Sequence, residues 1–194
     1  LLNRATQRQF QLGSIFKILT AIAALEEKKS TPARTVECRG RFTEAANRFR
    51  CWTVSHGVPP HGAMTVATAL EQSCNCYFYQ MGHDLSFEQL SGWAQRVGFG
   101  RKTGIEVGEA AGALPRPESH PRWRVSDSYS LAIGQHELAA TPLQVARMLA
   151  VVANGGKLVK PHLLRGNGSV EDLGISKETL AVVTGQQPGL AGGP

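Results

Sequence analysis

The run SIFKILTAIAALEEK, residues 14–28, restricts the possible folds more than any other part of the chain. Nearly every position before Glu26 is apolar, and a helix that is apolar on all sides lies either in a protein core or in a membrane. The run is shorter than the roughly 20 residues that a membrane crossing needs. The sequence therefore predicts a buried central helix that starts at Ser14, a residue type that favours helix caps.

This helix carries an S-x-x-K motif, formed by Ser14 and Lys17. Positions i and i+3 share one face of a helix, so the hydroxyl and the amine are placed to act as nucleophile and base. A lysine is a poor base at its ordinary pKa near 10.4, and burial disfavours its charged form. The alternative is that Ser14 only caps the helix and Lys17 only extends its amine to solvent.

A second polar constellation, Ser73-Cys74-Asn75, follows 59 residues after Ser14. Such residues often satisfy a local turn. Two serines, a lysine and an asparagine in this order indicate a serine acyltransferase that uses lysine as its base. In an extended or turning backbone the side chain of Cys74 points away from its two neighbours, toward the back of the site.

Composition limits the remaining choices. A chain of 194 residues with 42% hydrophobic residues is expected to form one domain with a sizeable core. The net charge of +6 comes from scattered basic residues, so we expect no nucleic-acid partner. A basic surface also suits an anionic cell-wall polymer. The sequence shows no signal peptide or membrane span.

Local patterns predict where further helices lie. Five stretches are expected to be helical: 14–28, 64–73, 75–83, 86–97 and 141–154. The last has Thr141 as its cap, Pro142 at its first position and Gly155 at its end. Residues 30–62 and 98–127 are rich in turn formers, and 157–165 is expected to be extended.

Four stretches resemble class B penicillin-binding proteins, in the order in which that family has them. They are LLNRATQRQFQLGSIFKILTAIAALEE, HGAMTVATALEQSCNCYFYQMG, VGFGRKTGIEVGEAAGALP and AIGQHELAATPLQVARMLAVVANGGKLVKPHLL, within residues 1 to about 165. The motifs S-x-x-K and S-D-N belong to this family, and Ser-Cys-Asn stands at the second. The elongation-type transpeptidase of the rod-shape machinery is the most similar subfamily. The resemblance implies an α+β, penicillin-recognising serine transpeptidase fold, represented mainly by its helical part.

The resemblance also implies roles for the site residues. Ser14 would attack the D-Ala-D-Ala bond of a peptidoglycan stem peptide, and β-lactams would acylate the same serine. Lys17 would be the base, Ser73 would relay a proton, and Asn75 would bind the substrate backbone and help to hold Lys17. The chemistry needs no cofactor. The alternatives are a β-lactamase or D,D-carboxypeptidase type of hydrolase, and a sensor module without catalysis.

The third family motif, K-T-G, has a literal match at Lys102-Thr103-Gly104 that we interpret as a decoy. It lies only 29 residues after Ser73, in a glycine-rich turn, whereas the family's motif lies on a strand after the ANGG block. We therefore expect residues 1–180 to be a partial transpeptidase domain that lacks the strands with the third motif. Residues 181–194 are expected to be a disordered Gly/Pro-rich end, and the chain alone to be nearly inactive.

The cysteines allow three interpretations. The chain has four of them, Cys38, Cys51, Cys74 and Cys76. Cys38 and Cys51 are candidates for a disulfide. Alternatively Cys38, Cys51, Cys74 and one histidine form a structural zinc site, with His61 favoured over His56 because it lies directly ahead of the helix that delivers Ser73. The third possibility is free thiols.

The resemblance finally implies a location and partners. We expect the domain at the extracytoplasmic (periplasmic) face of a bacterial membrane, anchored by an N-terminal segment that is absent from this sequence. Its expected partners are stem peptides, β-lactams and membrane proteins of cell-wall synthesis such as a glycosyltransferase.

Overall fold

The computed structural model describes residues 2–42, 48–166 and 168–186. Helices predominate in these residues, together with two small antiparallel sheets. This agrees with the expected α+β class, in which the helical part is the larger one.

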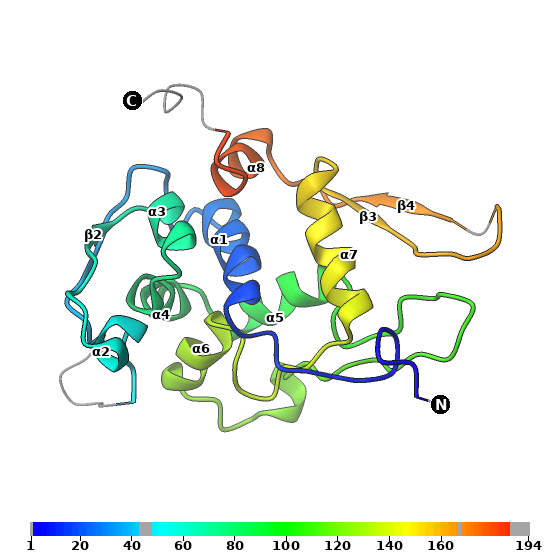
Figure 1. Ribbon diagram of the computed structural model, residues 1–194, viewed down its shortest axis with the longest axis horizontal. Coiled ribbons are helices and arrows are strands. Elements are labelled where there is room, and N and C mark those ends of the chain that lie inside the picture. Colours follow the sequence, from blue (N-terminus) through cyan, green and yellow to red (C-terminus); the bar gives the residue numbers. More distant parts are fainter. Residues whose placement is uncertain (1, 43–47, 167, 187–194) are drawn as a thin grey trace.

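Helix α1 (Phe16–Glu26) forms the centre of the molecule (Figure 1). A short 3₁₀ turn, η1 (Gly13–Ile15), leads into it. Eight of its eleven residues are buried, including Lys17, because it contacts helices on several sides. These helices are α3 (Val66–Glu71), α4 (Asn75–Asp84), α5 (Phe87–Arg96), α6 (Val125–Ala132) and α8 (Lys177–Val183).

The two sheets lie at opposite sides of the helical core (Figure 1). Strand β1 (Val36–Cys38) pairs with β2 (Gly62–Met64), and the register places Cys38 opposite Gly62. Helix α2 (Trp52–His56) lies on the same side of the molecule. On the other side, β3 (Lys157–Val159) pairs with β4 (Val170–Asp172) next to α7 (Pro142–Ala153). A short 3₁₀ helix, η2 (Pro117–Ser119), precedes α6 along the chain.

Side-chain caps fix several helix starts. Thr65, Ser86 and Thr141 each form a capping box, at α3, α5 and α7. Each box satisfies two backbone N–H groups that would otherwise lack a partner. The predicted cap at Thr141 and the proline at the next position are thus present at α7.

The predicted boundary at residue 180 is wrong, because it falls inside a helix. Helix α8 continues to Val183, with Ser176 as its cap and Val182 buried against the core. Residues 181–183 are therefore part of the folded domain. Residues 184–186 follow the helix and are described, and residues 187–194, the remainder of the expected disordered end, lie outside the described residues.

Within the described part of the chain, no helix combines the length and the apolar character that a bilayer crossing requires.

Candidate active site

Ser14 lies in η1, at the point where the chain enters the central helix. This entrance is fixed by a hydrogen bond from Gly13 N to Gly134 O of 2.9 Å and by an isolated β-bridge between Phe10 and Ala140. The two backbones are so close that a Cβ atom on Gly134 would lie 2.1 Å from Gly13 O. The position of the Ser14 hydroxyl is thus set by backbone contacts on both sides, while the residue itself is exposed.

The segment 72–75 leads from the end of α3 to Asn75, the first residue of α4. We call it the catalytic loop, after the roles that the sequence predicts for Ser73 and Asn75. Ser73 has a left-handed backbone with φ of 50°, which is unfavourable for a residue with a side chain. Cys74 is the N-cap residue of α4 and is fully buried. This geometry turns Ser73 and Asn75 toward Lys17, while Cys74 points into the protein behind them.

Lys17 joins the central helix to the catalytic loop through three hydrogen bonds. Its Nζ atom lies 2.8 Å from Ser73 O, 2.9 Å from Ser73 Oγ and 2.6 Å from Asn75 Oδ1. A lysine ammonium has three N–H donors, so these acceptors satisfy all of them. The alternative in which Lys17 extends to solvent is excluded, since the residue is only 1% exposed.

Burial changes the acid–base character of Lys17. Desolvation lowers its pKa to about 8, although the nearby thiols of Cys51 and Cys74 act in the opposite direction when ionised. A pKa near the working pH is what a general base requires. The structure therefore has the lowered Lys17 pKa that burial of this amine was expected to cause.

The i, i+3 spacing predicts a direct contact between Lys17 and Ser14, whereas in the structure Ser73 links the two side chains. Ser73 Oγ donates a hydrogen bond to Ser14 Oγ at 3.1 Å and accepts one from Lys17. Ser73 therefore stands between the other two in a chain of hydrogen bonds.

The literal K-T-G lies in the loop between α5 and η2. Thr103 donates two hydrogen bonds to Glu109, from N at 2.9 Å and from Oγ1 at 2.7 Å, and Gly104 N donates another at 2.7 Å. These groups thus close a local turn. Neighbouring Arg101 O accepts a hydrogen bond from Gln144 of α7, so the loop is attached to that helix.

The predicted cysteine and histidine residues meet directly behind the catalytic loop. The ligand atoms of Cys38, Cys51, Cys74 and His61 all lie within 4.8 Å of one another. His61 Nδ1 is 3.6 Å from Cys38 Sγ and 3.5 Å from Cys51 Sγ. The pairing of β1 with β2 explains this meeting, because it places the end of β1 beside the residue that follows His61.

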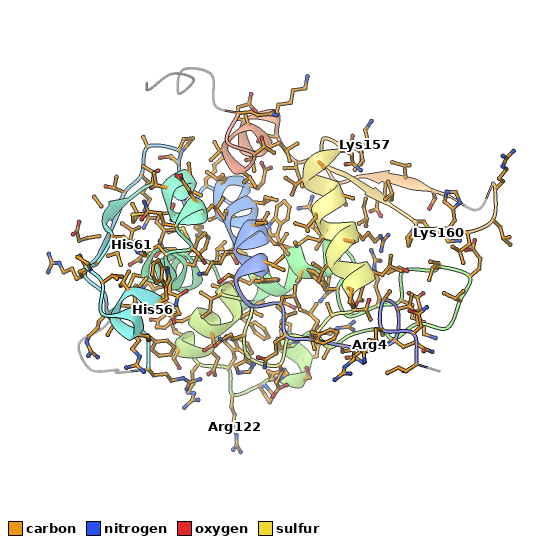
Figure 2. All side chains as sticks on the ribbon, in the orientation of Figure 1. Arg4, His56, His61, Arg122, Lys157 and Lys160 are labelled. Atoms are coloured by element: carbon orange, nitrogen blue, oxygen red, sulfur yellow. The ribbon has the colours of Figure 1, made fainter. Side chains whose placement is uncertain are left out.

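His56, the other histidine considered, is not part of this group. Its Nδ1 atom lies 2.9 Å from Trp52 O, one turn earlier in its own helix. Figure 2 shows His56 and His61 on the same side of the molecule. The four cysteines are free thiols in the structure, so the alternative disulfide between Cys38 and Cys51 is not formed there.

Cys76 lies beside Cys38 and Cys51, and we call these three thiols and that of Cys74 the thiol cluster. From the sequence alone, no role was assigned to Cys76. Hydrogen bonds from the thiols of Cys74 and Cys76 lower the pKa of Cys51. The same bonds, together with burial, raise the pKa of Cys74 and of Cys76. Among Cys51, Cys74 and Cys76, these contacts thus favour the thiolate form at Cys51, and a buried anion of this kind favours a bound cation.

Comparisons with known proteins agree with this geometry. Residues 1–186 match the family described as the penicillin-binding protein transpeptidase domain. The peptidoglycan D,D-transpeptidase MrdA of Haemophilus influenzae is 35% identical over 173 residues, which cover 85% of this chain and 26% of that protein.

Solved structures give the same result. PBP2 of Helicobacter pylori is 30% identical with a TM-score of 0.83, covering 95% of this chain and 35% of that one. In its complex with MreC, PBP2 of H. pylori is 32% identical with a TM-score of 0.81, covering 93% and 34%. The chain thus spans about a quarter of the length of the MrdA proteins that it matches. Because the match to the transpeptidase family extends over residues 1–186 of the 194 in this chain, the chain belongs to the penicillin-binding protein transpeptidase family.

Proposed function

We propose that this protein is a peptidoglycan D,D-transpeptidase that works through an acyl-serine, and that β-lactams acylate the same residue. The observation that carries the proposal is the continuous chain of hydrogen bonds from Lys17 through Ser73 to Ser14. It connects an exposed nucleophile to a buried amine of lowered pKa. The relatives named MrdA support the choice of peptidoglycan as the substrate.

The reaction follows from these contacts. Ser14 Oγ attacks the carbonyl carbon between the two terminal D-Ala residues, and its proton passes through Ser73 to Lys17. The developing oxyanion is stabilised by the backbone N–H of Ser14. The last D-Ala leaves with a proton returned along the same path, and an ester remains on Ser14. The amine of a second stem peptide then attacks the ester and loses a proton to Lys17. As the bond between the acyl carbon and Ser14 Oγ breaks, that proton returns through Ser73 to Ser14 Oγ, so that the hydroxyl and the neutral amine are both restored.

Labelling with a fluorescent penicillin tests this proposal on the full-length protein. We expect Ser14→Ala to abolish labelling while the circular dichroism spectrum stays unchanged, because the hydroxyl is exposed and its loss leaves no cavity. Normal labelling of the variant would refute the assignment of the nucleophile. Rapid release of the bound penicillin by the unaltered protein would instead favour the hydrolase alternative.

We further propose that the thiol cluster holds one structural zinc ion. Three cysteine sulfurs and one histidine nitrogen are a closed donor set for tetrahedral zinc, and the positions of Cys38, Cys51, Cys74 and His61 fit it. The site would attach strand β1, the start of α2 and the catalytic loop to one another. Because Cys74 lies between Ser73 and Asn75, the ion would act by ordering that loop and would take no part in the chemistry.

Elemental analysis of purified protein tests the metal proposal. We expect one equivalent of zinc in the unaltered protein and its loss in Cys51→Ala. Cys76→Ala is the matched control, since it removes a buried thiol that is outside the four-ligand set, and it should keep the metal. Zinc content below 0.1 equivalent in protein prepared without chelators, with all thiols titratable, would contradict the proposal.

The location and the partners also belong to the proposal. A transpeptidase of this kind acts where its polymer is assembled, so we place the protein at the extracytoplasmic face of the cell membrane. The solved complex of PBP2 with MreC supports an association with membrane proteins of cell-wall synthesis. Fractionation of cells, with penicillin labelling of each fraction, would show the location.

A further inference from the structure

The chain just before α2 and the first residue of that helix contact both ends of the catalytic loop. The indole of Trp52 donates a hydrogen bond from Nε1 to Gln72 O at 3.0 Å. Asn75 donates one from Nδ2 to Arg50 O at 3.3 Å. These two contacts bracket Ser73, the middle residue of the hydrogen-bonded chain in the candidate active site.

The backbone of Ser73 needs such support. Its left-handed φ of 50° is unfavourable, and a strained conformation of this kind persists only where the surrounding structure fixes it. The peptide group after Ser73 is held from two helices. Its carbonyl oxygen accepts a hydrogen bond from Lys17 of α1 at 2.8 Å, and its N–H, that of Cys74, donates to Ala69 O of α3 at 2.9 Å.

Trp52 holds the peptide group on the other side, which joins Gln72 to Ser73. The N–H of this group donates to Leu70 O at 3.2 Å, and its carbonyl oxygen accepts the indole hydrogen bond. Because peptide groups are planar, the φ angle of Ser73 is a rotation between these two groups. Holding both of them therefore fixes this angle, and with it the direction of the Ser73 side chain.

The indole N–H is the part of Trp52 that this contact requires. The side chain is 37% exposed, and its ring packs edge-on against that of His61, with the centroids 5.3 Å apart. A phenylalanine ring offers a similar edge-on contact, since this arrangement comes from the aromatic quadrupole. The indole adds a hydrogen-bond donor that phenylalanine lacks.

We propose that Trp52 is a positioning residue, whose indole N–H keeps Ser73 Oγ within hydrogen-bond distance of Ser14. This inference rests on the proposed function, because that function gives the hydrogen-bonded chain its role in proton transfer. Hydrogen bonds weaken steeply as their geometry departs from the optimum, so a small rotation at Ser73 slows the transfer. Trp52 takes up no proton itself and acts through the catalytic loop.

Trp52→Phe in the full-length protein tests the inference, since it removes the N–H and keeps a ring beside His61. Stopped-flow measurement of penicillin acylation gives the dissociation constant of the initial complex and the rate constant of acylation separately. We expect the rate constant to fall roughly tenfold, about the effect of one lost hydrogen bond, while the dissociation constant changes less than about twofold. The zinc content should equal that of the unaltered protein.

Trp93→Phe is the matched control, because it removes the same group at a buried site away from the catalytic loop. Its Nε1 atom donates to Glu27 Oε1 at 2.9 Å, at the other end of α1 from Lys17. We expect this variant to lose thermal stability and to keep its acylation rate constant within about twofold.

A second replacement covers the case in which Trp52→Phe does not fold. Incorporation of β-(3-benzothienyl)alanine in place of Trp52 exchanges the N–H for sulfur at nearly unchanged shape. It should lower the acylation rate constant to the same extent, because it removes the same donor.

Four results would overturn the inference. The first two are an unchanged rate constant in folded protein without the donor, and an equal loss in Trp93→Phe. The third is a loss confined to the dissociation constant, which would place Trp52 in contact with the substrate. The fourth is a zinc content that falls with the rate constant, which would trace the effect to the metal site. Penicillin labelling of the unaltered protein and of Ser14→Ala is independent of these results, so the proposed function can stand while this inference fails.

Discussion

Lys17 combines two properties that oppose each other in solution. It is almost fully buried, which favours the neutral amine, and it has three oxygen acceptors, which suit the ammonium form. Desolvation has the larger effect and brings its pKa to about 8. The neutral form that a base needs is therefore accessible without strong alkali.

This balance predicts a pH dependence for acylation. Since the pKa of Lys17 is lowered to about 8, the fraction of neutral amine rises as the pH increases through that value. We expect the rate of penicillin acylation by the full-length protein to rise between pH 7 and pH 9 and then to level off, with a midpoint near the pKa. Stopped-flow measurement of acylation would determine it.

Lys17→Arg provides the control for this dependence. A guanidinium does not release its proton in this range, so the variant should lose acylation almost completely and show no midpoint. A variant that kept its activity would show that only the positive charge of Lys17 matters.

The site residues were predictable from the sequence because their types, their order and the resemblance of the surrounding stretches to a known family all single them out. The sequence predicted Ser14, Lys17, Ser73 and Asn75 as site residues, and the structure brings all four together. It could not predict that Ser73 is placed between the side chains of Lys17 and Ser14, because this depends on the packing of α3 and α4 against α1 and on the left-handed backbone of Ser73.

At the scale of elements, predictability followed length and capping. The helices α1, α4, α5 and α7 have at least ten residues and were expected close to their observed positions. Helices α2, α6 and α8 have five to eight residues and were missed. Helix α6 starts after Arg124, which is not a usual capping residue, and β1, β2 and β4, which were not expected, have only three residues each. Strand β3 lies at the start of the segment 157–165 that was expected to be extended. Such short elements form through tertiary contacts and leave little trace in the sequence.

One side chain at the start of α7 connects two elements and is open to a direct test. Gln144 is 1% exposed. It accepts a hydrogen bond from Thr141 N and donates to Arg101 O and Ala111 O, all within 2.9 Å. Gln144→Ala leaves these buried groups unpaired, and we expect it to lower the free energy of unfolding by about 2–4 kcal/mol.

Urea denaturation measures this change. The exposed residue Gln135 offers a control, because Gln135→Ala should change the free energy of unfolding by less than about 0.5 kcal/mol. Similar stability of both variants would mean that the buried groups find other partners.

At the scale of the whole molecule, the other helices pack around α1 (Figure 1), and the side chains of the candidate active site meet where that helix begins. The distance of the literal K-T-G motif from the candidate active site depends on how the whole chain folds. Lys102 lies in a loop whose neighbouring groups bind Glu109 and Gln144, away from the hydrogen-bonded chain at Ser14.

We therefore expect Lys102→Ala to leave penicillin acylation of the full-length protein within about twofold, as is usual for surface substitutions. Labelling rates and thermal unfolding should be measured together. Loss of acylation at unchanged stability would show that Lys102-Thr103-Gly104 is the functional motif.

The place of Cys74 between Ser73 and Asn75 would let a coloured metal ion at the proposed zinc site act as a spectroscopic probe of the catalytic loop. Cobalt(II) accepts the same tetrahedral thiolate and imidazole ligands as zinc, and its visible absorption depends on their arrangement. An ion bound at this cysteine would be attached directly to the loop that carries Ser73 and Asn75. The colour of a cobalt-substituted protein would then report movements of the catalytic loop in real time, with no dye attached and no change to any residue.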